Sequence, residues 1–150
     1  MQYEALSYIN IRIPMRDGVE LAADLYLPAG AVSKPTPLPT ILSFSPYLAT
    51  STRDAGSLTW VRRGFAGLRV DCRGRGQSGG TFVPWTTDVD DAWDLLEWIS
   101  NQTWSNGRVG MVGGSYPGAT QLAALSSGHP ALVAAAPSAI TTDPYDLYYT

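Results

Sequence analysis

One stretch of the sequence, residues 109–118, limits the possible folds more than any other. It starts with a short apolar run, passes through two glycines and Ser115, and continues into residues 116–127, which Gly128 terminates. A short apolar run predicts a buried strand, and glycines allow the chain to turn sharply. Pro117 suits the first turn of a helix, where a missing N–H costs little. The stretch therefore predicts a strand, a tight bend at Ser115 and a helix.

Strands and helices alternate along the rest of the chain. Residues 7–14 alternate between polar and apolar, with Ile9, Ile11 and Ile13 on one face, and a second alternating run follows the turn at Asp17-Gly18. These two runs predict an antiparallel hairpin. Further strands are expected at 40–44, 66–71, 109–113 and 132–136, with helices at 57–63, 89–99 and 116–127 and a proline-containing connection at 29–39. A hairpin followed by this alternation predicts the α/β class with a mostly parallel sheet.

The clearest helix carries five apolar residues at helical spacing: Val89, Ala92, Trp93, Leu96 and Ile99. This spacing predicts that the helix packs through one apolar stripe. Four aspartates occupy the same segment: Asp88, Asp90, Asp91 and Asp94. Their spacing is not that of a calcium-binding loop, so we interpret them as a solvated helix face.

Composition excludes several classes of function. The net charge of -3 and the pI of about 4.9 argue against nucleic acid or an anionic membrane as a partner. The chain shows no signal-peptide pattern and no apolar run near the ~20 residues that cross a bilayer. Cys72 is the single cysteine, so an internal disulfide is excluded and a cytoplasmic location is the expectation. One histidine and one cysteine do not favour a zinc site, and we expect no metal and no cofactor.

Ser115 is the residue in the bend whose side chain could act as a nucleophile. A serine hydroxyl is a weak nucleophile unless it is held clear of the sheet and given a base. A tight strand-to-helix bend presents Oγ in this way, and the following helix directs its N–H groups toward a developing oxyanion. The backbone N–H of Tyr116 would be one such donor. The alternative is that Ser115 only caps the helix; the predicted strand–bend–helix context favours the nucleophile.

The glycine-rich loop over 73–80 follows another predicted strand. Asp71 stands at the end of that strand, and Arg73 and Arg75 stand beside glycines, as in some phosphate-binding loops. No phosphate-loop pattern follows, so we interpret all three as structural. The five tryptophans are interpreted as packing residues.

Four segments carry a resemblance to a known family. Residues 14–26 form a hairpin pattern, Ser45-Pro46-Tyr47 follows a strand, Asp71-Cys72-Arg73-Gly74 opens the glycine-rich loop, and Gly113 to Gly118 reads G-x-S-Y-x-G. In these segments, and over nearly its whole length, the chain resembles the cocaine esterase-like and X-Pro dipeptidyl-peptidase-like serine hydrolases of the α/β-hydrolase superfamily.

The resemblance implies the fold and the chemistry. Residues 1–150 would be the N-terminal portion of one α/β-hydrolase catalytic domain. The implied reaction is acyl transfer to water through an acyl-enzyme on Ser115, with a small-molecule ester, amide or X-Pro peptide as substrate. The implied oxyanion hole consists of the backbone N–H of Tyr116 and the hydroxyl of Tyr47.

The base for Ser115 is not evident in the sequence. The one histidine, His129, lies just past the helix that starts after Ser115, and a rise of ~1.5 Å per residue puts it roughly 20 Å from Oγ. The chain order nucleophile, acid, histidine would place both partners beyond Thr150. We therefore expect the 150 residues alone to be inactive. The alternative is a naturally truncated, non-catalytic remnant or interaction module.

Overall fold

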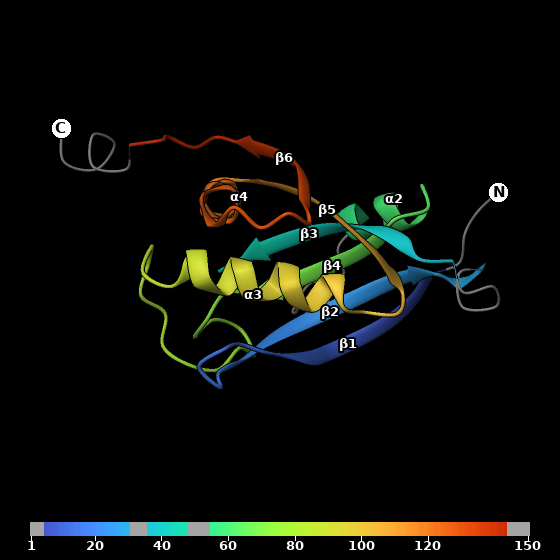
Figure 1. Cartoon of the computed structure of the whole chain (residues 1–150), viewed down its shortest axis with the longest axis horizontal. Coiled ribbons are helices and arrows are strands. Elements are labelled where there is room, and N and C mark those ends of the chain that lie inside the picture. The colour runs from blue at the N-terminus through green and yellow to red at the C-terminus, as the bar shows by residue number, and fades with distance from the viewer. Residues whose placement is uncertain (1–4, 31–35, 48–54, 144–150) are drawn as a thin grey trace.

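The computed structural model describes residues 5–30, 36–47 and 55–143, which form one sheet with helices packed against it (Figure 1). The strands are β1 (Ala5–Pro14), β2 (Glu20–Pro28), β3 (Leu38–Ser45), β4 (Ala66–Asp71), β5 (Ser105–Gly114) and β6 (Leu132–Ser138). Between them lie α2 (Ala55–Val61), α3 (Asp88–Ser100) and α4 (Tyr116–Ser127). Every strand and helix expected from the sequence is present, with ends that differ by a few residues. The expected connection at 29–39 falls partly on residues 31–35, which lie outside the described residues.

The sheet has the strand order β1-β2-β4-β3-β5-β6. Strand β2 pairs antiparallel with β1 and with β4, whereas the pairs β3–β4, β3–β5 and β5–β6 are parallel. The predicted α/β class with an opening hairpin is therefore confirmed. Helices α3 and α4 pack against each other and against β5, and Figure 1 shows α3 in front of the strands.

The core lies between the inner strands and the two long helices. The inner strands are nearly continuous in apolar residues because helices and loops cover them. Fully buried side chains come from β3, β4, β5 and α3, among them Leu42, Phe44, Leu68, Val70, Met111, Leu95, Leu96 and Ile99.

The first strand departs from the predicted alternation. Ile13 is fully buried, but Ile9 is 58% exposed, so the prediction that both share one buried face is wrong. The register of β1 against β2 shifts between Tyr8 and Ile11, and Asn10 has a φ of 56°. The backbone N–H of Asn10 donates to the buried carboxylate of Asp24 at 2.8 Å. The extra residue of this bulge shifts the alternation of side chains by one, so residues N-terminal to it point to the opposite face from that expected.

The apolar stripe predicted for α3 is also partly wrong. Val89 and Trp93 are 41% and 36% exposed, whereas Leu95 is fully buried. The buried positions are Asp88, Asp91, Ala92, Leu95, Leu96 and Ile99, which is a stripe rotated to include two aspartates. Polar partners stabilise these carboxylates: Arg73 for Asp91 and the Tyr116 hydroxyl for Asp88. The interpretation of all four aspartates as a solvated face is therefore wrong for these two.

The parallel strands end at one edge of the sheet. Ser45 at the end of β3 is level with Asp71 at the end of β4, and Gly114 at the end of β5 is level with Ser138 in β6. In open α/β sheets, ligands bind in the crevice outside the carboxyl ends of the strands. The segments that follow β3, β4 and β5 are those that contain the candidate residues.

Candidate active site

Ser115 occupies a sharp bend between β5 and α4. Its φ of 61° and ψ of -132° lie outside the helical and strand regions, and its side chain is exposed. Such a conformation costs a non-glycine residue of order 1–3 kcal/mol, and it persists only where the surroundings fix it. The Ser115 N–H donates to Ser138 O at 3.0 Å, and Ser115 O accepts from Gly118 N at 2.7 Å and Ala119 N at 3.2 Å. The predicted strand–bend–helix geometry is present.

Glycines next to the bend leave room for the close approach of α4 to the sheet. Gly113 has a φ of 149°, and a Cβ atom placed there would lie 2.5 Å from the Cβ of Pro117. A Cβ atom on Gly118 would lie 3.0 Å from Ser138 O. The glycines of the G-x-S-Y-x-G pattern therefore have a steric role, because they allow α4 to start directly over β5 and β6.

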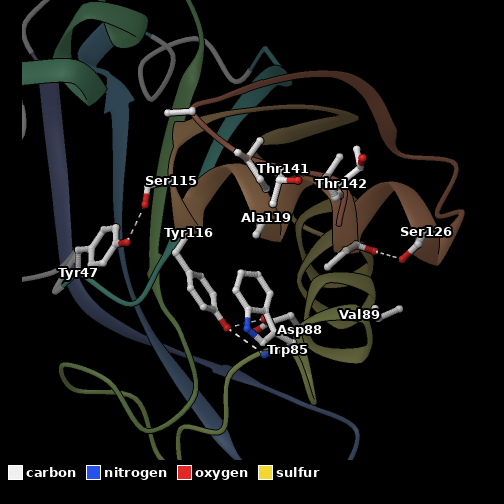
Figure 2. A pocket seen from close by; sticks show the side chains of 14 residues that line it. Tyr47, Trp85, Asp88, Val89, Ser115, Tyr116, Ala119, Ser126, Thr141 and Thr142 are labelled. Atoms are coloured by element: carbon white, nitrogen blue, oxygen red, sulfur yellow. Dashed lines mark hydrogen bonds between the residues drawn. The ribbon is translucent and has the colours of Figure 1, made fainter. Parts of the chain in front are cut away.

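Tyr47 and Ser115 meet across the edge of the sheet. Tyr47 follows β3, and its hydroxyl oxygen lies 3.0 Å from Ser115 Oγ, with either group able to donate (Figure 2). The Tyr47 backbone N–H donates to Ser45 Oγ at 3.1 Å, which fixes the turn after the strand. Tyr116 begins α4, so its N–H belongs to the first turn of the helix and has no intrahelical acceptor. The structure thus brings the Ser115 hydroxyl, the Tyr47 hydroxyl and the Tyr116 N–H to the same edge of the sheet.

The side chain of Tyr116 connects α4 to the start of α3. Its hydroxyl donates to Asp88 Oδ2 at 2.7 Å and accepts from the backbone N–H of Trp85 at 3.1 Å. The ring stacks on Trp85 with centroids 4.5 Å apart, as Figure 2 shows. Burial raises the pKa of Asp88 above its ordinary value, and burial beside Asp88 raises the pKa of the Tyr116 hydroxyl. Sequence reasoning missed both Asp88 and Trp85, because no spacing pattern connects them to the serine.

The raised pKa of Asp88 predicts a pH dependence of stability. The folded chain keeps the Asp88 proton to higher pH than the unfolded chain does. This group therefore makes folding less favourable as the pH rises above 3.8, the ordinary pKa of an aspartate. In Asp88→Asn the side chain is neutral at every pH. The stability of Asp88→Asn relative to wild type should therefore increase between pH 3.5 and 7, measured by urea unfolding. Asp90→Asn, an exposed position on the same helix, is the control and should show no such trend; a constant difference for Asp88→Asn would contradict the prediction.

A pocket of about 420 Å³ lies next to Ser115. Its wall includes Tyr47, Trp85, Asp88 and Tyr116 and continues along one side of α4, where Ala119 and Leu122 line it. Figure 2 shows Ser115 and Tyr47 at one end of this group and Val89 and Ser126 at the other. The pocket is mostly apolar, as is usual for sites that bind small organic molecules.

His129 follows α4, at the end of the helix opposite Ser115, and both of its ring nitrogens have hydrogen-bond partners there. It is 6% exposed, its Nε2 lies 3.1 Å from Glu97 Oε2, and its Nδ1 accepts from the Ala131 N–H at 3.1 Å. The Ala131 contact assigns the ring proton of a neutral imidazole to Nε2, which then donates to Glu97. Trp93 packs edge-on against the ring. His129 therefore connects α3 to the segment after α4.

Asp71 and Arg73 shape the loop after β4. Asp71 is fully buried and accepts from the Gln77 N–H at 3.3 Å, and a Cβ atom on Gly76 would collide with its carboxylate. Arg73 pairs with Asp17 and Asp91, each at 2.6 Å. The structural interpretation of these two residues is confirmed.

Over residues 5–30, 36–47 and 55–143, no three His, Cys, Asp or Glu side chains are grouped so that they could hold a metal ion. In the same part of the chain, no helix is both long and apolar enough to cross a bilayer.

Comparison with known proteins gives consistent relatives. The family model described as X-Pro dipeptidyl-peptidase (S15 family) matches residues 17–150. Cocaine esterase of Rhodococcus sp. is 45% identical over 141 residues, which cover 91% of this chain and 24% of the esterase. A putative serine esterase of Mycobacterium bovis is 32% identical, covering 96% of this chain and 26% of its own length.

Solved structures agree with these relatives. An α-amino acid ester hydrolase superposes with a TM-score of 0.77 at 34% identity, over 89% of this chain and 25% of the hydrolase. A CocE/NonD family hydrolase from Staphylococcus aureus superposes with a TM-score of 0.78 at 26% identity, over 88% of this chain and 27% of its own. The chain thus spans about a quarter of the length of these relatives. With a family model that covers most of its residues and a matching fold, the chain belongs to the X-Pro dipeptidyl-peptidase (S15) family of α/β-hydrolases.

Proposed function

We propose that residues 1–150 supply the nucleophile and the oxyanion hole of a serine hydrolase that cleaves small ester, amide or X-Pro peptide substrates. The observation that carries the proposal is the strained bend at Ser115 with the Tyr47 hydroxyl 3.0 Å from its Oγ. The names of the relatives, which include a cocaine esterase and a putative Xaa-Pro dipeptidyl-peptidase, support the same reaction class.

The proposed reaction has two acyl-transfer steps. Ser115 Oγ attacks the substrate carbonyl carbon and loses its proton to a base, while the Tyr47 hydroxyl and the Tyr116 N–H stabilise the negative oxygen of the tetrahedral intermediate. The intermediate collapses to an acyl-enzyme, and the leaving group departs with a proton. Water then attacks the acyl carbon, which releases the acid and restores the serine hydroxyl.

The base is proposed to lie outside these 150 residues. The single histidine is engaged with Glu97 and Ala131, so it is not available to Ser115. A base must come within hydrogen-bond reach of the proton that it removes. We therefore expect the 150-residue chain to react slowly at Ser115 unless a base is added.

Labelling with a fluorophosphonate tests this proposal without requiring turnover. Mass spectrometry of the labelled chain should place the adduct on Ser115, slowly in buffer and faster as free imidazole is added to replace the missing base. Ser115→Ala should remove both the adduct and its dependence on imidazole. An adduct spread over several serines, or one unchanged in Ser115→Ala, would exclude a nucleophilic role and favour a non-catalytic module. Fast stoichiometric labelling without imidazole would refute the assignment of the base to residues outside the chain.

A further inference from the structure

A second hollow, of about 410 Å³, adjoins the pocket at Ser115. The two share Tyr47, Trp85 and Tyr116, so they lie on either side of the same aromatic wall. The rest of the second hollow is lined by Pro46, Arg75, Phe82 and Pro84. Among the described residues that line the two hollows, Arg75 is the only cationic side chain. Arg75 therefore places a positive charge in the hollow next to the one that contains Ser115.

The Arg75 guanidinium is held in place by two contacts. Its Nε–H donates to Pro46 O at 3.1 Å, in the segment that leads to Tyr47. Its Cζ atom lies 5.5 Å from the centroid of the Phe82 ring, within the range of a cation–π contact. These contacts use one of its five N–H groups. In the described part of the chain, its two terminal nitrogens have no hydrogen-bond acceptor.

Arg73, two positions earlier in the same loop, shows what a structural arginine looks like here. It contacts the carboxylates of Asp17 and Asp91 at 2.6 Å each, and its side chain is 11% exposed. Arg75 is exposed, and no carboxylate of the described residues pairs with it. Hydrogen bonds thus engage Nε and both terminal nitrogens of Arg73, whereas those of Arg75 with the described residues engage only its Nε–H.

We propose that Arg75 binds a carboxylate carried by the substrate, in the hollow that adjoins Tyr47 and Tyr116. The proposal rests on the function proposed for Ser115, and it narrows the substrate to esters or amides with an anionic group near the reacting carbonyl. The terminal N–H groups of a guanidinium match the two oxygens of a carboxylate. The surrounding Phe82, Pro84 and Trp85 suit an apolar or aromatic body. Arg75 is the one cationic side chain in the described wall of this hollow, among aromatic and proline side chains.

Binding of small probes tests the proposal without any catalytic step. Benzoate, benzamide and phenyl phosphate are titrated into the ¹⁵N-labelled chain, and dissociation constants are read from amide and indole shifts. Benzoate should bind more tightly than benzamide, with shifts at Trp85 and at the amides of residues 115–116. In Arg75→Gln the dissociation constant for benzoate should rise about tenfold, the size expected for one charge-assisted contact, while that for benzamide stays unchanged.

Control variants separate this site from general effects. Arg108→Gln, at an exposed arginine near the start of β5, should bind benzoate as wild type does. Arg75→Lys should retain part of the preference for benzoate. Equal binding of benzoate by wild type and by Arg75→Gln would overturn the proposal. It would also be overturned if wild type bound phenyl phosphate more tightly than benzoate and Arg75→Gln lost that binding. If benzoate binding depends on Arg75 but Ser115 is not labelled, the proposed function is refuted and the carboxylate site is not.

Discussion

Replacing Arg73 by glutamine is expected to lower the free energy of unfolding by about 3–5 kcal/mol, the cost of breaking a buried ion pair on one side. Arg73 donates from Nη2 to Asp91 Oδ1 at 2.6 Å and from Nε to Asp91 Oδ2 at 3.0 Å. The Asp91 side chain is 1% exposed. Loss of the guanidinium therefore leaves a buried carboxylate whose remaining side-chain donor, among the residues that the structure describes, is the Thr87 hydroxyl at 3.1 Å. Urea unfolding at pH 7 measures the loss.

Two further variants show whether the buried charge is the cause. Arg16→Gln removes the pairs with Asp90 and Asp94, but Arg16 is 51% exposed, so its loss should matter little. Adding Asp91→Asn to Arg73→Gln removes the stranded charge and should recover part of the stability. Equal losses in Arg73→Gln and Arg16→Gln, or no recovery in the double variant, would show that burial of Asp91 is not the source.

The alternation of strands and helices could be predicted because it depends on local patterns. The apolar runs of β3, β4 and β5 and the terminators of α4 are visible in a few neighbouring residues. The bend at Ser115 is similar, since glycines and a proline at fixed offsets identify it. These features need no knowledge of what lies across the sheet.

The errors have long-range causes. Apolarity alone assigned Val89 and Trp93 to the buried face of α3, but the partners of Asp88 and Asp91 rotate that face. Those partners, Tyr116 and Arg73, are 28 and 18 residues away. In the same way, Ile9 is exposed because Asn10 bonds to Asp24 on the next strand. A buried polar pair is a property of two distant positions, and one sequence does not show which positions meet.

The contact between Tyr47 and Ser115 belongs to the same class of information. The two residues are 68 positions apart, and they meet because β3 and β5 are parallel neighbours that end at one edge. Without the family resemblance, Tyr47 would be one exposed tyrosine among several. The contact with Ser115 Oγ predicts a specific effect of removing the Tyr47 hydroxyl.

Tyr47→Phe should slow the imidazole-assisted labelling of Ser115 by about 10²–10³-fold, the loss typical for one oxyanion-hole donor. The substitution keeps the ring and removes only the hydroxyl that lies 3.0 Å from Ser115 Oγ. Because Tyr47 is 59% exposed, the change should leave the unfolding transition in place, so a slow rate would not reflect a damaged fold. The matched control is Tyr8→Phe, because Tyr8 is also an exposed tyrosine but lies on β1. This variant should label at the wild-type rate.

The dependence on imidazole separates two roles that the Tyr47 hydroxyl could have. A donor to the oxyanion lowers the barrier whatever base is present, so Tyr47→Phe should reduce the rate by the same factor at every imidazole concentration. A hydroxyl that itself removed the Ser115 proton would be replaced by added base, and the defect would then shrink as imidazole rises. A constant factor therefore supports the oxyanion assignment, whereas recovery by imidazole would assign Tyr47 to proton transfer. A change of less than about threefold, far below the loss of one donor, would remove Tyr47 from the site.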